Sequence, residues 1–404
     1  MTRFQKIAVA TVIATILLVT VGVIVRVTGS GMGCPDWPLC YGQPIPPLDD
    51  YKAWWEWIHR TIAAVIGFLI LGVAFFAWKD HRDRRSILWP SIAAVLLVGF
   101  QAWLGRETVR MNNSGESVTA HLAAAMLLLG LLVYVTVRAF YPARLPARGG
   151  SQRFTLLAAF TAAAMFVLLL FGSNVTAQDA GLVFPDWPLM NGALIPVGPD
   201  TDRSVRPLYE AHVLHRYVAG VVLVLVWVTT VVAWRTQRAR PTIVWLAVAI
   251  GIMYPIQVVM GGLQVFTRLA DWTQTLHVAL SAMLWGLAVA LAVAAYYEAR
   301  TAKPAAEGGG EPGSGPGPGS GPDPAPGSDQ PAGLDLPPGS ELDEAMIPYV
   351  ALFPGTPPSV VSPAATAAAP GGRGAKARAY IELTKPRIIE LLLITTIPAM
   401  VLAT

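Results

Sequence analysis

EWIHR, residues 56–60, and HVLHR, residues 212–216, are two versions of one short signature. Each begins where a polar loop passes into a long apolar run, so His59 and His215 are expected about one turn inside a membrane helix. A second histidine follows at the same interval in both cases, because His121 and His277 each lie 62 residues further on. This matched spacing predicts two ligand pairs in a duplicated fold.

The composition is that of an integral membrane protein. The 404 residues are 54% hydrophobic and only 13% charged, with a mean hydropathy of +0.52, whereas soluble domains carry about 25% charged residues. The net charge of +4 is not a nucleic-acid signal, since the basic residues lie in short loops where they set membrane topology. We expect membrane lipid around the chain and no nucleic-acid partner.

About 20 apolar residues cross a bilayer core as a helix. On this criterion the sequence predicts spans at 7–27, 56–78, 87–104, 118–138, 154–173, 210–234, 241–262 and 274–297. Arg and Lys gather at the start of the chain and in the loops after the second, fourth and sixth spans. The positive-inside rule then predicts a multi-pass protein of the cell membrane with a cytoplasmic amino terminus.

The chain repeats itself. CPDWPLC at 34–40 returns as FPDWPLM at 184–190, and Gln101 and Gly105 return as Gln257 and Gly261. Such repeats often mark an ancestral unit with a site in each half. We therefore predict an all-α membrane protein of two tandem four-helix bundles, residues 1–150 and residues 151–300.

The composition changes after the eighth span. Residues 301–375 are rich in Gly, Pro and Ser, which predicts a disordered cytoplasmic linker. Residues 376–404 then begin a further domain, with an apolar run after Lys385-Pro386-Arg387 that is expected to enter the membrane as one partial helix.

The histidine pairs suit a haem iron. His59 and His121 lie near the starts of two parallel spans, so their rings are expected at one depth near the extracytoplasmic side. Two imidazoles that face each other inside a four-helix unit can take both axial positions of a haem. Zinc favours further Cys or carboxylate ligands, and the sequence near His121 and His277 supplies none. Taken singly, a membrane histidine is as often a packing residue or a proton relay.

The two halves differ next to the histidines. Glu56 lies three residues before His59, on the same helix face, and His212 holds the equivalent position in the second half. A carboxylate in a membrane site is costly unless it is paired or functional. The asymmetry favours chemistry in the first half, with Glu56 as its catalytic group. The alternative is a structural carboxylate paired with Arg60.

Several neighbouring residues admit two roles. Arg60 and Arg216 suit haem propionates or simple anchoring near a helix end. Gln101 and Gln257 suit a substrate contact or, more simply, a bridge between helices. The loop cysteines form a disulfide if the loop faces an oxidising compartment, or remain free thiols; they are Cys34 and Cys40.

Together these residues resemble haem A synthase over residues 1–300: the Glu56-x-x-His59-Arg60 motif, the partner histidines and the CPDWPLC loop. The resemblance implies oxidation of the C8 methyl group of haem O to the formyl group of haem A, for cytochrome oxidase assembly. It implies substrate haem O at His59 and His121, a resident haem b at His215 and His277, catalysis by Glu56, and a Cys34–Cys40 disulfide.

The last residues have a second likeness. The stretch ELTKPRIIELLL, residues 382–393, resembles the start of haem O synthase, the prenyltransferase that makes haem O from protohaem. Its Asp-rich motifs are missing, so no prenyltransferase activity is expected. A fusion of consecutive enzymes that is cut short at Thr404 is the simplest interpretation, and haem O synthase is an expected partner.

Two other functions compete. A b-type cytochrome that only transfers electrons also needs two histidine pairs, but it does not need the Glu56 to His212 difference. A haem carrier or transporter built from inverted repeats is the second alternative. Parallel halves with intact histidine pairs count against it.

Overall fold

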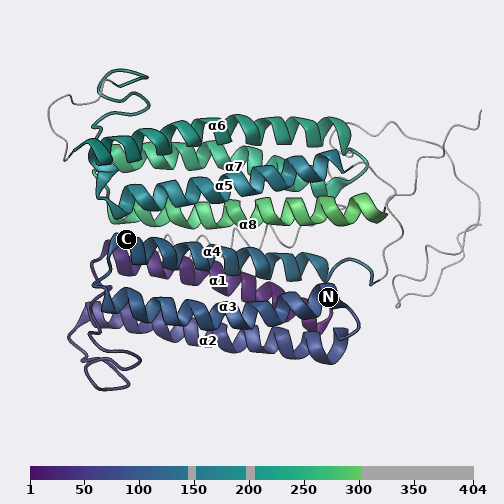
Figure 1. Ribbon diagram of the computed structural model, residues 1–404, viewed down its shortest axis with the longest axis horizontal. Coiled ribbons are helices and arrows are strands. Elements are labelled where there is room, and N and C mark those ends of the chain that lie inside the picture. Colours follow the sequence, from purple (N-terminus) through teal and green to yellow (C-terminus); the bar gives the residue numbers. More distant parts are fainter. Residues whose placement is uncertain (144–151, 197–204, 302–404) are drawn as a thin grey trace, which may run out of the picture. The chain divides into compact units, whose positions relative to one another are not determined.

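The computed structural model describes residues 1–143, 152–196 and 205–301 (Figure 1). Eight helices in these ranges are long and apolar enough to cross a membrane. They are α1 (Arg3–Val27), α2 (Tyr51–His81), α3 (Arg85–Arg110), α4 (Gly115–Arg138), α5 (Arg153–Ala177), α6 (Arg206–Thr236), α7 (Pro241–Phe266) and α8 (Asp271–Thr301), with a short 3-10 helix η1 (Ala180–Leu182) between α5 and α6. The predicted all-α membrane fold and its eight spans are confirmed.

The helices are longer than the predicted spans because backbone hydrogen bonding continues beyond the apolar residues, and three of the helices begin at a side-chain cap. The Thr2 side chain accepts the Gln5 N–H at the start of α1, with the Gln5 side chain reaching back to Thr2 N–H. The side chains of Asp50 and Ser114 accept backbone N–H groups at the starts of α2 and α4. Hydropathy locates the lipid core, whereas these caps set where α1, α2 and α4 begin.

The four helices of each half pack in a closed ring. In the first half α1 packs on α2, α2 on α3, α3 on α4, and α4 on α1. In the second half α5 to α8 close in the same order. Helices α2 and α4 therefore lie diagonally across their bundle, as do α6 and α8, so side chains on their inner faces meet at the centre.

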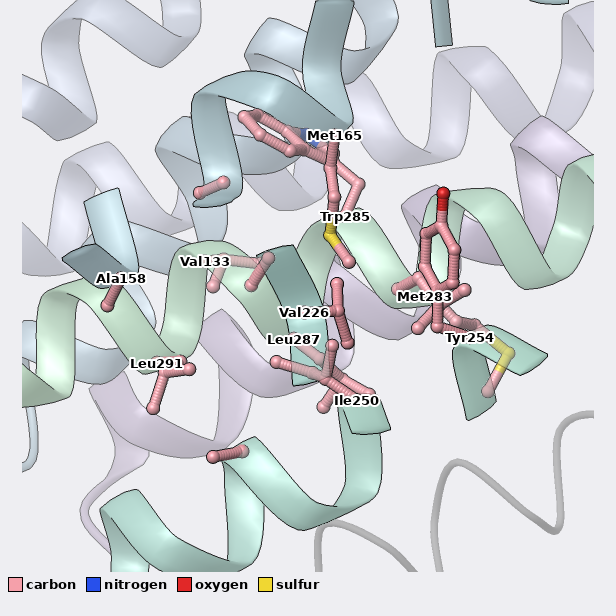
Figure 2. Packing of buried hydrophobic residues seen from close by; sticks show 14 of the residues in the cluster. Val133, Ala158, Met165, Val226, Ile250, Tyr254, Met283, Trp285, Leu287 and Leu291 are labelled. Carbon is pink, nitrogen blue, oxygen red and sulfur yellow. The ribbon is translucent and has the colours of Figure 1, made fainter. Parts of the chain in front are cut away.

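The described helices belong to one compact unit. Helices α1 and α4 pack against α8, and α4 also packs against α5. The largest core cluster runs across this contact and includes Val133 of α4, Met165 of α5 and Trp285 of α8 (Figure 2). The indole N–H of Trp285 donates to the carbonyl of Met126 at 2.8 Å. The outer faces carry exposed apolar side chains such as Phe68 and Leu96, as a helix in lipid requires.

The predicted linker and the prenyltransferase-like tail lie, from residue 302 onward, outside the described residues. Both stay predictions.

Candidate functional site

The four predicted ligand histidines are interior residues near one end of the bundles. His59 is the ninth residue of α2 and His121 the seventh of α4. His215 is the tenth residue of α6 and His277 the seventh of α8. These four helices begin at the same end, called the histidine end from here on. The members of each pair come from diagonal helices.

Every one of these rings lies against a glycine of the neighbouring helix. A Cβ atom on Gly22 of α1 would lie 3.0 Å from Cε1 of His59, and one on Gly105 of α3 would lie 3.2 Å from Cε1 of His121. A side chain there would displace the imidazole. The first bundle thus seats each of its histidines against a bare backbone on the next helix.

The second bundle repeats this arrangement. A Cβ atom on Gly172 of α5 would lie 3.1 Å from Cε1 of His215, and one on Gly261 of α7 would lie 3.2 Å from Cε1 of His277. The sequence showed that Gly105 returns as Gly261, but Gly22 and Gly172 were missed. Their signal was a small residue one helix before each EWIHR-type signature, which is common in membrane helices.

Two glutamines tie the second histidine of each pair to the preceding helix. Nε2 of Gln101 donates to the His121 carbonyl at 2.9 Å and lies 3.3 Å from Nε2 of that imidazole. Nε2 of Gln257 donates to the His277 carbonyl at 2.9 Å and lies 3.1 Å from its Nδ1. Helix bridging, the simpler of the two predicted roles, is confirmed for both.

Buried polar atoms without partners face this region. Among the described residues, Nδ1 of His59, His121 and His215 and Oε1 of Gln101 and Gln257 are buried without a hydrogen-bond partner. Leaving a buried polar group unsatisfied costs about 1–3 kcal/mol. Three of four imidazoles therefore keep a ring nitrogen free of protein partners inside the bundles.

These residues fit a haem iron better than a closed metal centre. Within the described ranges there is no group of three or more His, Cys, Asp and Glu side chains able to hold a metal ion. A structural zinc site needs four such ligands, whereas a haem iron needs two axial ones from facing helices. The residues that fit this role are the predicted ones, His59 with His121 and His215 with His277.

Glu56 joins helix α2 to the loop above the first bundle. Its side chain is buried, with the residue 4% exposed. Oε2 accepts the Cys34 N–H at 2.9 Å, and Oε1 accepts a short hydrogen bond from Nη2 of Arg60. The predicted alternative, a carboxylate paired with Arg60, describes this contact. The catalytic role of Glu56 stays a prediction.

His212 takes the same position in the second bundle with different chemistry. Its Nδ1–H donates to the Ala180 carbonyl at 2.8 Å, and its Nε2 accepts from Nε of Arg216 at 3.0 Å. A ring that donates through one nitrogen and accepts through the other is neutral imidazole. Where the first half has an ion pair between Glu56 and Arg60, the second half thus has a hydrogen bond from Arg216 to a neutral imidazole. The ring of Phe184 packs edge-on against the His212 ring.

Both arginines of the signature hold the loops. Nη1 of Arg60 donates to the carbonyls of Asp36 and Leu39 at 2.7 and 3.0 Å. Nη1 of Arg216 donates to the carbonyls of Asp186 and Leu189 at 3.0 and 2.8 Å. Anchoring is therefore present at both. Nη2 of Arg216 is buried without a partner among the described residues, so one donor remains for a ligand such as a propionate.

The two PDWP loops have the same internal structure. The Asp36 carboxylate accepts the N–H groups of Tyr41 and Gly42 at 2.6 and 2.8 Å, and Asp186 accepts those of Asn191 and Gly192 at 2.7 Å each. The hydrogen bond from Gly42, assisted by those from Tyr41 and Asp36 itself, holds the pKa of the Asp36 carboxyl below its ordinary value despite some desolvation.

The loops differ in how they are closed. Cys34 and Cys40 form the predicted disulfide, where the second loop has Phe184 and Met190, both buried. The first loop is stabilised by the disulfide and by the hydrogen bond from Cys34 N–H to Glu56. At the equivalent positions the second loop is stabilised by the buried side chains of Phe184 and Met190.

The sequence matches the family described as cytochrome oxidase assembly protein over residues 5–289, from α1 into α8. It is similar to the Heme A synthase of Alkalihalophilus pseudofirmus, 28% identical over 288 residues, which cover 70% of this chain and 94% of that protein. It is also 28% identical to the Heme A synthase of Halalkalibacterium halodurans over 259 residues, which cover 62% of this chain and 83% of that protein. The Heme A synthase of Brucella ovis is 28% identical over 328 residues, which cover 70% of this chain and 88% of that protein.

Proposed function

Because this chain belongs to the family of cytochrome oxidase assembly proteins, we propose that it is a haem A synthase, an oxidoreductase that converts the C8 methyl group of haem O to the formyl group of haem A. Relatives that it matches over most of their length carry this name. The observation that carries the proposal is a duplicated histidine pair with a carboxylate, Glu56, beside only one copy. Electron transfer alone gives no reason for that difference.

In the proposed first-half site, His59 and His121 hold the substrate haem by its iron. The glycine contacts support this role, because each of these imidazoles packs against the bare backbone of a neighbouring helix and could not keep its position beside a larger residue. In the second half His215 and His277 would hold haem b, which when bound supplies one-electron redox chemistry. Arg216 would offer its free Nη2 to a propionate.

Glu56 is the proposed catalytic group, accepting a proton as the methyl carbon is oxidised. General bases work within hydrogen-bond reach of the proton they take. In the structure Arg60 donates a hydrogen bond to Oε1 of Glu56 and further hydrogen bonds to three carbonyls of the loop that contains the disulfide. A proton on Oε1 would weaken the contact with Arg60, so turnover and the position of this loop are expected to be coupled.

The proposed setting is the cell membrane, with the amino terminus in the cytoplasm and the histidine end outside. The clusters of Arg and Lys at residues 79–85 and 235–240 support this orientation. The Cys34–Cys40 disulfide supports it as well, since such bonds persist in oxidising compartments. Haem O synthase would supply the substrate, and the assembly of cytochrome oxidase would take the product.

Pigment analysis tests the proposal. The chain is expressed with a haem O source, purified, and its pigments are extracted and chromatographed. A haem A synthase yields haem A together with haem b. A b-type cytochrome yields unmodified haem b alone, and a carrier retains little haem relative to protein. Either of the last two results would overturn the assignment.

A further inference from the structure

A cavity of about 600 Å³ opens at the end of the bundles opposite the histidine end. It lies between the halves, because α4 lines one side while α5 and α8 line the other. Its walls include Tyr134, Arg138, Thr155, Ala159, Tyr296 and Arg300. Arg138 is the last residue of α4, whereas His121 is the seventh, so the cavity is separate from the proposed haem sites by roughly 25 Å of helix. We call it the inter-bundle cavity.

One cation of the inter-bundle cavity is deeply buried. Arg138 is 2% exposed. Its guanidinium donates to the Ser86 hydroxyl at 2.8 Å and to the carbonyls of Tyr141 and Pro142 at 3.0 Å each. It also lies over the ring of Tyr297, 4.9 Å from the centroid. All of these partners are neutral, so the buried charge is solvated but not balanced.

A second cation stands beside it. The guanidinium of Arg300 lies over the Tyr296 ring, 4.2 Å from the centroid, and its Nε is buried with no hydrogen-bond partner in the described part of the chain. Neither Arg300 nor Arg138 is within ion-pair distance of a carboxylate of the described residues. The nearby Glu298 accepts from the Tyr141 hydroxyl and does not line the cavity. The cavity therefore has a net positive charge and an unused donor.

Part of the remaining wall is apolar. Ala159, Ala292 and Val293 line it, and Ala159 is exposed. A ligand that suits both the arginines and the apolar part of the wall has an anionic head group and a hydrocarbon tail that continues into the bilayer. Basic pockets between transmembrane helices bind the head groups of anionic lipids in this way, and the volume is within the range of small-molecule sites.

We propose that the inter-bundle cavity binds the phosphate head group of an anionic membrane phospholipid. The phosphate would accept hydrogen bonds from Arg300 and balance the charge of Arg138. Its acyl chain would lie along Ala159 and Val293. The lipid would span the contact between the two halves, next to the hydrogen bond of 2.9 Å that joins the Tyr134 and Tyr297 hydroxyls. Bound lipid should therefore stabilise the packing of the bundles against each other.

The test is lipid binding to the purified full chain in neutral detergent. Native mass spectrometry would count bound short-chain phosphatidylglycerol and phosphatidylcholine during titration, and thermal unfolding would follow the same lipids and inorganic phosphate. We expect one tight phosphatidylglycerol site that raises the unfolding midpoint. Equal binding of phosphatidylcholine, or equal stabilisation by inorganic phosphate, would overturn the proposal.

Matched variants locate the site. Arg300→Gln should weaken phosphatidylglycerol binding by roughly fivefold, the effect of one basic residue near a lipid surface, and Arg300→Lys should retain most of it. Ala159→Phe keeps both charges but fills the cavity, so it should also weaken binding. The control Arg235→Gln removes an exposed cation from the last turn of α6 and should change nothing. Loss of binding in the control, or full binding in both Arg300→Gln and Ala159→Phe, would contradict the assignment.

Discussion

At the scale of single residues, the position of each site histidine depends on a glycine of the neighbouring helix. Gly22, Gly105, Gly172 and Gly261 each place bare backbone against Cε1 of one imidazole. Any larger residue would displace the ring. Interiors resist such insertions at a cost of about 1–3 kcal/mol. The position of each imidazole thus depends on the glycine of the adjacent helix as much as on the helix that carries the histidine.

Gly172→Val should lower the haem b content of the second half by roughly tenfold or more, because the new side chain collides with the His215 ring. The measurement is the ratio of pyridine haemochrome to protein in purified material. Gly220→Val is the matched control, since a Cβ atom at Gly220 meets nothing within 4 Å. Equal haem content in the two variants would refute the seating role.

Glu56→Gln should retain haem in both halves and form the disulfide, yet yield no haem A. The amide can still accept the Cys34 N–H, but it cannot accept a proton as a base. Extracted pigments and thiol titration measure both readouts. Glu116→Gln is the control, because Glu116 is an exposed carboxylate in the first turn of α4. Undiminished haem A from Glu56→Gln would leave Glu56 with only its structural contacts.

Spacing in the sequence was sufficient to predict that the histidines and glutamines occupy equivalent places in the two halves, because the duplication repeats their intervals. It could not identify Gly22 or Gly172, since the loop lengths between these glycines and their histidines differ in the two halves. Nor could it decide between the two roles of Arg60. The carbonyls that Arg60 binds are main-chain atoms of a folded loop, and their positions depend on its turns rather than on residue type.

At the scale of elements, the two PDWP loops keep one backbone design with different closures. Tyr41 and Asn191 have positive φ angles of 54° and 56°, and each is followed by a glycine with positive φ. That turn aims two N–H groups at the aspartate at the start of the loop. The apolar spans were predictable from composition, whereas this turn was not, because it depends on hydrogen bonds across five and six residues.

The Asp36 contact has a definite pH dependence. Its folded-state pKa lies below the ordinary 3.8, mainly because Gly42 N–H binds the ionised form. A depressed pKa stabilises the fold above the ordinary pKa, and that contribution is lost as the pH falls through the folded-state pKa. The protection factors of the Tyr41 and Gly42 amides should therefore be equal at pH 7 and pH 5, and should fall only below pH 3.8.

Hydrogen exchange followed by mass spectrometry measures these protection factors. Asp36→Asn should reduce them already at pH 7, because one of the two acceptor oxygens is lost. Asp49→Asn, in the same loop and exposed, is the control and should leave them unchanged. Protection that declines between pH 7 and pH 5 in the unsubstituted chain would contradict the stated role of Asp36.

At the scale of the whole described structure, two repeats are joined along α1, α4, α5 and α8. Thr119, two residues before His121, is 2.9 Å from the Ser173 hydroxyl, and Ser173 follows the glycine that seats His215. The two candidate sites are thus linked through one hydrogen bond between the halves. The repeats were predictable from the sequence. Which helices would form their contact was not, because hydropathy does not distinguish a lipid-facing helix from a helix-facing one.

Trp285→Phe should lower the free energy of unfolding by about 1–3 kcal/mol, since it removes the hydrogen bond to the Met126 carbonyl and leaves a gap in the shared core. The haem content of both halves should be unchanged. Unfolding by denaturant in detergent measures the first quantity. Trp234→Phe, at a site that is 55% exposed on α6, should have little effect. Equal destabilisation by both changes would argue against a core role for Trp285.

The central claim is that each bundle holds its own iron by its own histidine pair, and that only the first pair serves the reaction. Its most direct test is haem analysis of His59→Ala and His215→Ala after expression with a haem O source. The account predicts that His59→Ala keeps haem b and forms no haem A, whereas His215→Ala loses haem b. Loss of the same pigment in both variants, or haem A formation by His59→Ala, would contradict it.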